Sequence, residues 1–144
     1  MLKASFDFKE VANKLDKLTK AAEDSVRPAA QAGAQKFYDQ VKANAPVSDG
    51  AHMFHGTHAV YGPYRPGNLR DSIYQVYSKD NSGQGKATYH IAWNHEKAPY
   101  GFMVEFGTSK APAHPFLRPA YTSRLNDAME ATKKRMLDEV KKAL

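Results

Sequence analysis

The residues best suited to chemistry in this chain are three histidines, His52, His55 and His58, which recur at every third position. Imidazole nitrogens bind zinc, copper and nickel, and on a helix this spacing would place the three rings roughly on one side. Three glycines in the segment 50–62 argue against a helix, and the only obvious carboxylate partner is Asp49. We therefore favour a histidine-bearing loop with no bound metal and expect no cofactor.

Glu105 is the second candidate, because it lies in the apolar run from Tyr100 to Phe106. A buried carboxylate is costly unless it is paired. Its burial could raise its pKa for general acid–base catalysis. Alternatively, it could form an ion pair with Arg70, with Arg118 or with an arginine of a neighbouring subunit. We favour the ion pair, because no second carboxylate is well placed for a two-carboxylate site.

No other arrangement of residues indicates an enzyme. No histidine is spaced from Ser72 or Ser109 in a way that indicates a catalytic pair, so the sequence gives no evidence for serine–histidine catalysis. The glycines form no phosphate-binding pattern at the start of a helix, which leaves nucleotide binding without support. The absence of cysteine excludes a disulfide framework and a thiolate zinc site. We therefore expect a non-enzymatic protein with no catalytic residue and no metal ligand.

The composition is that of an ordinary soluble globular protein. A length of 144 residues suits one domain, so we assign residues 1–144 to a single domain. Hydrophobic residues at 42% and charged residues at 25% exclude a largely disordered chain. The net charge of +6 comes from scattered basic residues, which permit loose, sequence-independent contact with phosphate. No long apolar run is present, so we expect neither a secretory signal nor a membrane span.

The elements that must position these residues begin with a long helix over residues 7–44. Pro28 lies inside this helix and predicts a kink, since proline removes a backbone donor. The helix ends before Pro46, because a residue that precedes proline is pushed out of the α region. Apolar residues recur along the helix at steps of three and four, at Val11, Leu15, Leu18, Ala22, Val26, Ala29 or Ala30, Gly33, Phe37 and Val41.

A stretch rich in glycine and proline follows at residues 48–66 and predicts a loop. These residues prevent a regular element, yet the stretch carries Met53, Phe54, Tyr61 and Tyr64, which are too apolar for a loop that meets only water. Exposed apolar patches of this kind mark partner sites. We therefore predict a contact loop outside the core. The competing interpretation is that Phe54 and Tyr61 complete the core.

Two antiparallel strands and a second helix complete the predicted fold. Residues 69–77 and 87–93 alternate in side-chain direction, and the flexible turn between them predicts a hairpin. The short apolar run 100–106 suits either a helical turn or a strand, and periodicity does not decide between them. A last helix starts around Pro119 and runs to residue 144. This order predicts an α+β fold, with an antiparallel sheet flanked by a long N-terminal helix and a C-terminal helix.

Three short motifs, taken in order, resemble a known family. The first is Ala45-Pro46 followed by Gly67-Asn68-Leu69-Arg70-Asp71-Ser72-Ile73, the second is YGFMVEFGT at residues 100–108, and the third is AHPFLRPA at residues 113–120. Together they are similar to the tailed-phage neck or tail-component family whose type member is gene product ten of a lambdoid siphophage. The resemblance covers residues 7–144, with residues 48–66 as an insertion relative to its pattern.

The resemblance implies a structural virion protein: a ring-forming neck subunit, as a tail completion or terminator protein or as a collar. It implies rings of six or twelve copies that join the head connector to the tail tube or terminator, with the genome passing through the lumen. It also implies non-specific contact with DNA there, no membrane partner, and assembly in the bacterial host cytoplasm. The structural and interface candidates are Leu69, Arg70, Ile73, Glu105, Phe106, Gly107, Pro115, Phe116, Leu117 and Arg118.

Two questions stay open at this level. The first is whether the proline-bounded segment 115–119 anchors the last helix within the chain or forms a subunit interface, since a rigid apolar segment suits both. The second is a function from another class: a metal- or nucleic-acid-binding module that uses the histidine-bearing loop and the net charge of +6. A monomer that holds zinc or binds DNA tightly would support this alternative, and a metal-free ring would support the neck subunit.

Overall fold

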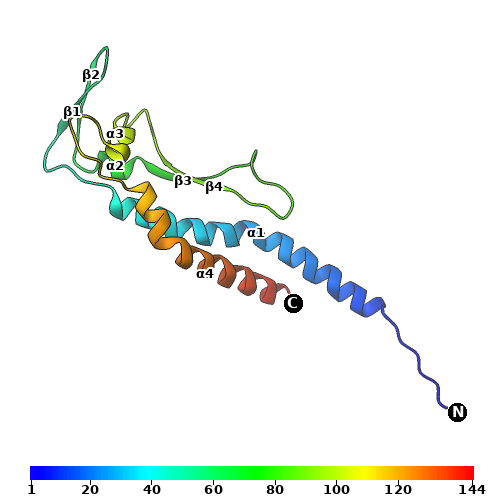
Figure 1. The fold of residues 1–144 in the computed structure, drawn as a ribbon. Helices are drawn as coiled ribbons and strands as arrows, with labels where there is room; N and C mark the ends of the chain where they lie inside the picture. The colour runs from blue at the N-terminus through cyan, green and yellow to red at the C-terminus, as the bar shows by residue number, and fades with distance from the viewer.

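Two long helices run side by side in opposite directions; one pair of strands projects from one end of them and the other pair runs alongside (Figure 1). The computed structural model describes all 144 residues. The two helices are α1 (Lys9–Asn44) and α4 (Leu117–Ala143). Between them lie β1 (His52–His55), β2 (Val60–Tyr64), α2 (Asn68–Asp71), β3 (Ile73–Tyr77), β4 (Tyr89–Trp93) and α3 (Gly101–Phe106). The predicted α+β fold with a helix at each end of the chain is confirmed.

The helix α1 is continuous through Pro28, and its axis bends near the middle (Figure 1). A proline without an N–H group weakens the helical ladder at this point, which is the predicted reason for a kink. The helix ends where Ala45 takes an extended conformation before Pro46. With 36 residues, α1 is about 54 Å long at 1.5 Å per residue.

Small side chains line the contact between α1 and α4. Ser25, Ala29 and Gly33 of α1 are buried, as is Ala128 of α4. A Cβ atom at Gly33 would collide with the hydroxyl of Thr132, so the two helices approach each other too closely for any larger residue there. This close approach buries backbone and small side chains and leaves larger apolar residues at the edges of the contact.

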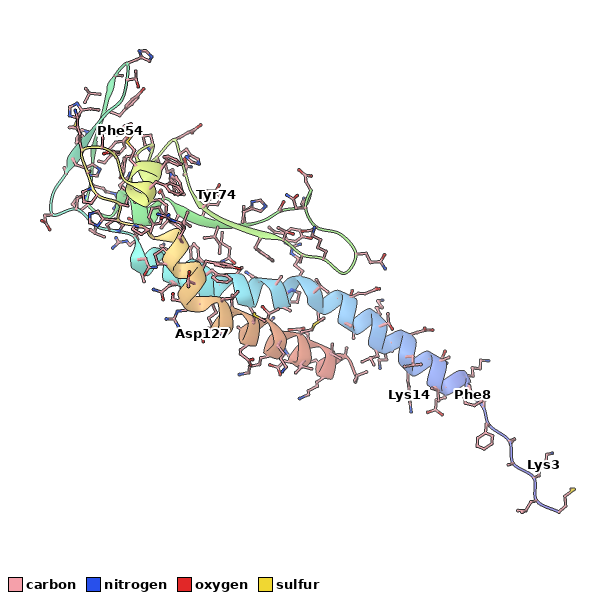
Figure 2. All side chains as sticks on the ribbon, in the orientation of Figure 1. Lys3, Phe8, Lys14, Phe54, Tyr74 and Asp127 are labelled. Carbon is pink, nitrogen blue, oxygen red and sulfur yellow. The ribbon has the colours of Figure 1, made fainter.

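The first third of α1 extends beyond α4. The C-terminal end of α4 reaches the level of Ala21, where Ala143 lies in the same shallow hollow. The predicted apolar positions Val11, Leu15 and Leu18 therefore have no partner within the chain and are 52%, 57% and 39% exposed. Figure 2 shows this part of α1 projecting away from the rest of the molecule.

Two separate two-stranded antiparallel sheets are present in place of the single predicted sheet. The pair β3–β4 is the predicted hairpin, with Ile73 opposite Trp93 and Tyr77 opposite Tyr89. The predicted strand over residues 69–77 is wrong for its first part, which forms the single turn α2. Turn geometry overrides side-chain alternation here, because the backbone N–H of Asp71 donates to the carbonyl of Gly67 at 2.9 Å.

The segment 48–66 is the second correction. It was expected to lack a regular element, but β1 and β2 pair in an antiparallel hairpin, with Phe54 opposite Tyr61 and His55 opposite Val60. Glycine and proline are tolerated because each strand of a two-stranded sheet is an edge strand. Its backbone N–H and C=O groups on the outer side form no hydrogen bonds to another strand. This hairpin projects from the body next to α3 (Figure 1).

The core lies where the C-terminal end of α1, β3–β4, α3 and the start of α4 meet. Its buried residues are Val41, Ala45, Leu69, Ile73, Trp93, Ala98, Tyr100, Phe116 and Ala120. The undecided run 100–106 is the helix α3, and Gly101 lies so close to the indole of Trp93 that a Cβ atom would overlap it. Only 19 of 144 residues are buried, so much of the apolar surface stays uncovered within one chain. No helix is long and apolar enough to cross a membrane.

Candidate functional site

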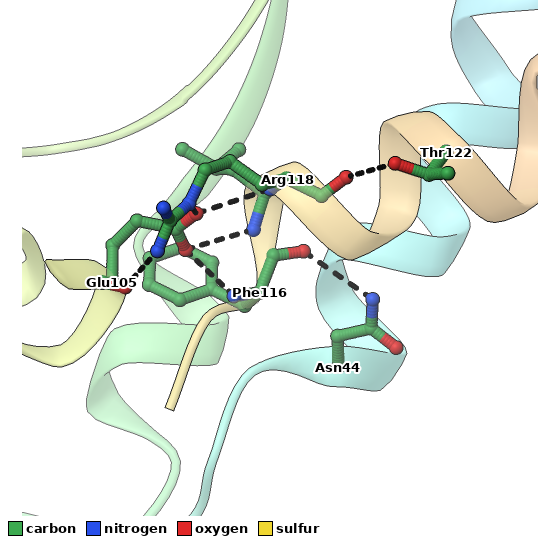
Figure 3. Close-up of polar contacts among 6 residues, drawn as sticks. Asn44, Glu105, Phe116, Arg118 and Thr122 are labelled. Atoms are coloured by element: carbon green, nitrogen blue, oxygen red, sulfur yellow. Dashed lines mark hydrogen bonds and ion pairs between the residues drawn. The ribbon is translucent and has the colours of Figure 1, made fainter. Parts of the chain in front are cut away.

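A carboxylate from one helix holds the start of another. Glu105, near the end of α3, accepts hydrogen bonds from the backbone N–H groups of Phe116 (2.6 Å), Leu117 (3.0 Å) and Arg118 (3.0 Å), as Figure 3 shows in part. The first N–H groups of a helix have no partner inside it, and here one side chain satisfies three of them at α4. Asn44 adds a link to α1 by donating to the carbonyl of Phe116 at 3.3 Å. We call this arrangement the Glu105 junction.

The predicted ion pair of Glu105 is made with Arg118 and is confirmed. The Nε of Arg118 donates to Oε1 of Glu105 at 3.1 Å, and its Nη2 donates to the backbone carbonyl of Glu105 at 2.8 Å. The same guanidinium lies 4.6 Å from the ring centroid of Phe106, a cation–π distance. Arg70 instead binds Asp71, at 3.1 Å, and together with Arg65 it holds the pKa of Asp71 below its ordinary value.

The charge of Glu105 is stabilised by its surroundings. Its side chain is only 1% exposed, and this burial, the largest single effect, would by itself raise its pKa. The N–H groups of Leu117, Phe116 and Arg118 and the Arg118 guanidinium together outweigh burial, so the pKa of Glu105 lies below its ordinary value. A carboxylate that stays ionised and faces donors on both oxygens has no proton to donate. The geometry therefore makes Glu105 a positioning residue for α4.

Gly107 turns the chain so that the third motif returns to the second. Its φ of +76° lies in the region that favours glycine, and a Cβ atom there would approach the backbone nitrogen of Ala113 to 2.7 Å. The returning segment is held where the N–H of His114 donates to the carbonyl of Val104 at 2.8 Å. The sequence motifs at 100–108 and 113–120 are thus one structural unit.

The other interface candidates divide between interior and surface. Leu69, Ile73 and Phe116 are buried in the core, so their role within one chain is packing. Pro115 and Leu117 are half-buried, with Leu117 packed against that core. The segment 115–119 therefore serves at least as an intrachain anchor. Arg70 and Phe106 are exposed and available to another molecule.

The hairpin β1–β2 has one inner and one outer face. Phe54 and Tyr64 are half-buried and pack against the core, with ring centroids 6.2 and 5.1 Å from that of Tyr100. The prediction that this segment lies outside the core is therefore wrong for these two residues, because antiparallel pairing turns alternate side chains inward. Met53 is 45% exposed on the outer face, whereas Tyr61 is 48% exposed but lies opposite Phe54 and stacks on its ring, with centroids 6.1 Å apart.

The three histidines do not converge. His52 packs its ring edge-on against Tyr100 at 4.8 Å, whereas His55 points to the exposed side of β1 and His58 lies in the turn. A spacing of three along a strand places side chains on opposite faces. No group of three or more His, Cys, Asp or Glu side chains in the chain is arranged to hold a metal ion.

Two exposed apolar surfaces were missed by the sequence reasoning. On α3, Phe102, Met103 and Phe106 are 61%, 43% and 51% exposed, and the two phenylalanine rings lie 4.7 Å apart. Their spacing of four would have indicated a shared face once the helix was known. The second is a groove between β4 and α4, across α1, of about 570 Å³. No short motif marks it, because its walls come from three distant segments.

Comparison with known proteins gives one match. The family model described as "Bacteriophage HK97-gp10, putative tail-component" matches residues 9–107, which span α1 to the end of α3. The matched region includes the first sequence motif, all but the last residue of the second, and Glu105. The third motif and α4 lie beyond it, so the partners of Glu105 at residues 116–118 are outside the matched range. No curated protein and no solved structure matches the chain.

Proposed function

The chain belongs to the HK97-gp10-like family of bacteriophage tail components, and from this membership we propose that it is a ring-forming subunit of the phage neck. In this role, copies of one domain close into a ring of six or twelve between the head connector and the tail tube or terminator. The ring joins the two by geometric fit, and the genome passes through its lumen. Its scattered basic residues, with a net charge of +6, suit non-specific contact with DNA phosphates there.

The observation that carries this proposal, beside the family match, is how little of the chain one copy buries. A monomeric protein rarely exposes large contiguous apolar patches, and such patches mark protein interfaces. Here large apolar side chains are exposed on the first third of α1, on α3 and on the hairpin β1–β2. These surfaces lie on different parts of an elongated molecule, as a subunit with several neighbours requires (Figure 1).

We assign the contact with the adjacent layer to the outer face of the hairpin β1–β2. Met53 is exposed there, while Phe54 and Tyr64 on the other face fasten the hairpin to the core and Tyr61 stacks on Phe54. A projecting element fixed at its base presents an apolar surface without a large ordering cost, which favours docking. The exposed rings of Phe102 and Phe106 belong to α3, which lies at the same end of the molecule (Figure 1).

Native mass spectrometry of the purified chain, alone and with the head connector of its phage, tests the proposal. We expect a closed ring in at least one of these samples, with no stoichiometric metal. In the phage itself, a nonsense mutation in this gene should yield filled heads and separate tails that fail to join, and a plasmid copy should restore joining. Monomer in both samples, or normal virions from the mutant, would overturn the assignment.

A further inference from the structure

One copy of the chain carries an apolar ridge and an apolar groove. The ridge, which we call the N-terminal stripe, consists of Phe8, Val11, Leu15 and Leu18, which share one side of α1 and are between 39% and 72% exposed. The groove lies between β4 and α4 and has α1 as its floor. Ten of its 13 lining residues are hydrophobic, among them Phe37, Ile91, Leu125 and Met129.

These two surfaces cannot meet within one molecule. The groove begins at Ala30 on α1, and the stripe ends at Leu18 on the same continuous helix. Twelve residues of helix separate them by about 18 Å along one axis. A helix cannot fold back on itself over that distance without breaking, so the stripe of one copy can reach only the groove of another.

The two surfaces match in length and in chemistry. A second hollow shares Phe37 and Ile91 with the groove and extends it to Val41 and Leu117. From Ala30 to Val41 the floor is about 17 Å long, and the stripe from Phe8 to Leu18 is about 15 Å long. Both surfaces are apolar, so burying one against the other removes both from water.

The stripe also continues an interface that the chain already makes. Leu15 and Leu18 lie on the side of α1 that, about two to four turns later, carries Ser25 and Ala29 into the contact with α4. α4 does not cover the stripe, because Ala143 lies beside Ala21 and the stripe lies farther toward the start of α1. Burial of its four side chains would remove on the order of 400 Å² per copy, about half of a standard one-sided interface. Each copy in a ring makes two such contacts, one with its stripe and one with its groove.

We propose that the N-terminal stripe of each copy docks into the α1–α4–β4 groove of its neighbour, head to tail. This inference rests on the proposed ring and specifies the contact that closes it. In a head-to-tail contact each copy is related to the next by the same rotation. When successive rotations add up to a full circle, the last copy contacts the first and the assembly is a closed ring. The N-terminal stripe of one copy and the groove of the next then bury each other. In the closed ring every stripe is buried in this way.

The absence of cysteine in the chain allows a direct test. A Leu15→Cys variant and a Met129→Cys variant are mixed, with distinct mass tags, and treated with a short bismaleimide reagent. Residue 15 lies near the middle of the stripe and Met129 lies in the groove, so we expect a cross-linked pair containing one of each. The matched control is Asn13→Cys with Met129→Cys, because Asn13 lies on the opposite side of α1. Its cross-link yield should be at least about tenfold lower.

A second variant tests whether the contact holds the ring. Leu15→Asp with Leu18→Asp should weaken assembly by roughly a hundredfold or more, since each leucine contributes about tenfold or more. Circular dichroism should show a folded chain, because both side chains are exposed in the subunit. Wild-type rings with equal cross-linking at positions 15 and 13 would overturn the stripe-in-groove contact and leave the ring standing. Cross-linking of the stripe to another virion protein would also overturn it, whereas wild-type monomer under all conditions would overturn the ring itself.

Discussion

Replacing Glu105 by glutamine should destabilise the subunit by about 3 kcal/mol, because one amide cannot accept from both sets of donors. Oε2 receives the N–H groups of Phe116 and Leu117, and Oε1 receives the backbone and side-chain N–H groups of Arg118. Glutamine offers one oxygen and one NH₂ group. Since Phe116 is fully buried, the oxygen should face Phe116 and Leu117, leaving the NH₂ group against Arg118.

The magnitude follows from what is lost in that orientation. The side chain of Arg118 is 59% exposed and can turn to water, but its backbone N–H loses its acceptor, which costs about 1–3 kcal/mol. The remaining two bonds lose the negative charge that strengthened them, at about 0.5–1 kcal/mol each. For a chain of this length the total corresponds to a fall in Tm of roughly 10 °C.

Urea denaturation and thermal melts at pH 7 measure the effect. The matched control is Glu130→Gln on the exposed side of α4, which should stay within about 0.5 kcal/mol of wild type. Arg118→Ala removes an exposed ion pair and should cost only about 1 kcal/mol. If Arg118→Ala costs as much as Glu105→Gln, the ion pair and not the backbone N–H groups holds the junction, and the reasoning is refuted.

The pH dependence of stability provides a second test of the role of the Glu105 charge. The pKa of Glu105 is held below its ordinary value of 4.5, so the unfolded chain binds this proton at pH values where the folded chain does not. The stabilisation is therefore complete above 4.5 and is lost as pH falls through the lowered pKa. The deficit of Glu105→Gln relative to wild type should shrink between pH 7 and pH 3. An unchanged deficit would show that the charge is not involved.

Two further predictions concern the core and the hairpin β1–β2. Gly101→Ala should destabilise the chain by about 1–3 kcal/mol, measured by urea denaturation, because the added methyl overlaps the indole of Trp93; an unchanged midpoint would contradict that packing. Phe54→Ala should cost about 2 kcal/mol, since its half-buried ring packs against Tyr100, whereas Met53→Ser should leave stability within about 0.5 kcal/mol and weaken docking to the adjacent ring. If thermal melts show a larger loss of stability for Met53→Ser than for Phe54→Ala, the inner and outer faces of the hairpin are misassigned.

Local sequence signals predicted the features that depend on local physics. The long helix ends before Pro46 because proline restricts the residue that precedes it, whatever the rest of the chain does. The pairing of Ile73 to Tyr77 with the returning strand follows from alternation and a flexible turn. The Glu105–Arg118 pair could be foreseen because a carboxylate in an apolar run needs a partner. The backbone N–H groups that also hydrogen-bond to Glu105 could not be predicted, because every residue except proline has such a group.

The features that the sequence did not predict depend on distant segments. The alternation over residues 69–77 predicts a strand, but residues 68–71 form a turn that packs Leu69 into the core that also contains Trp93. The hairpin β1–β2 forms despite its glycines and prolines because the aromatic side chain of Tyr100 covers its inner face. The apolar periodicity of α1 is real along its whole length. Where it finds a partner within the chain is decided by the stretch along which α4 packs against α1, and α4 lies far away in the sequence.

The Glu105 junction has a consequence for assembly that an ordinary helix cap would not have. A capping serine or aspartate belongs to the helix it caps and satisfies one or two of its N–H groups, so it leaves the direction of that helix free. Glu105 comes from α3 and holds three N–H groups of α4, and its two oxygens fix α4 relative to α3. The apolar face of α3 and the groove beside α4 are thereby held in one orientation. In a ring whose closure depends on the angle between two contacts, a loosened junction should impair assembly even where the subunit remains folded.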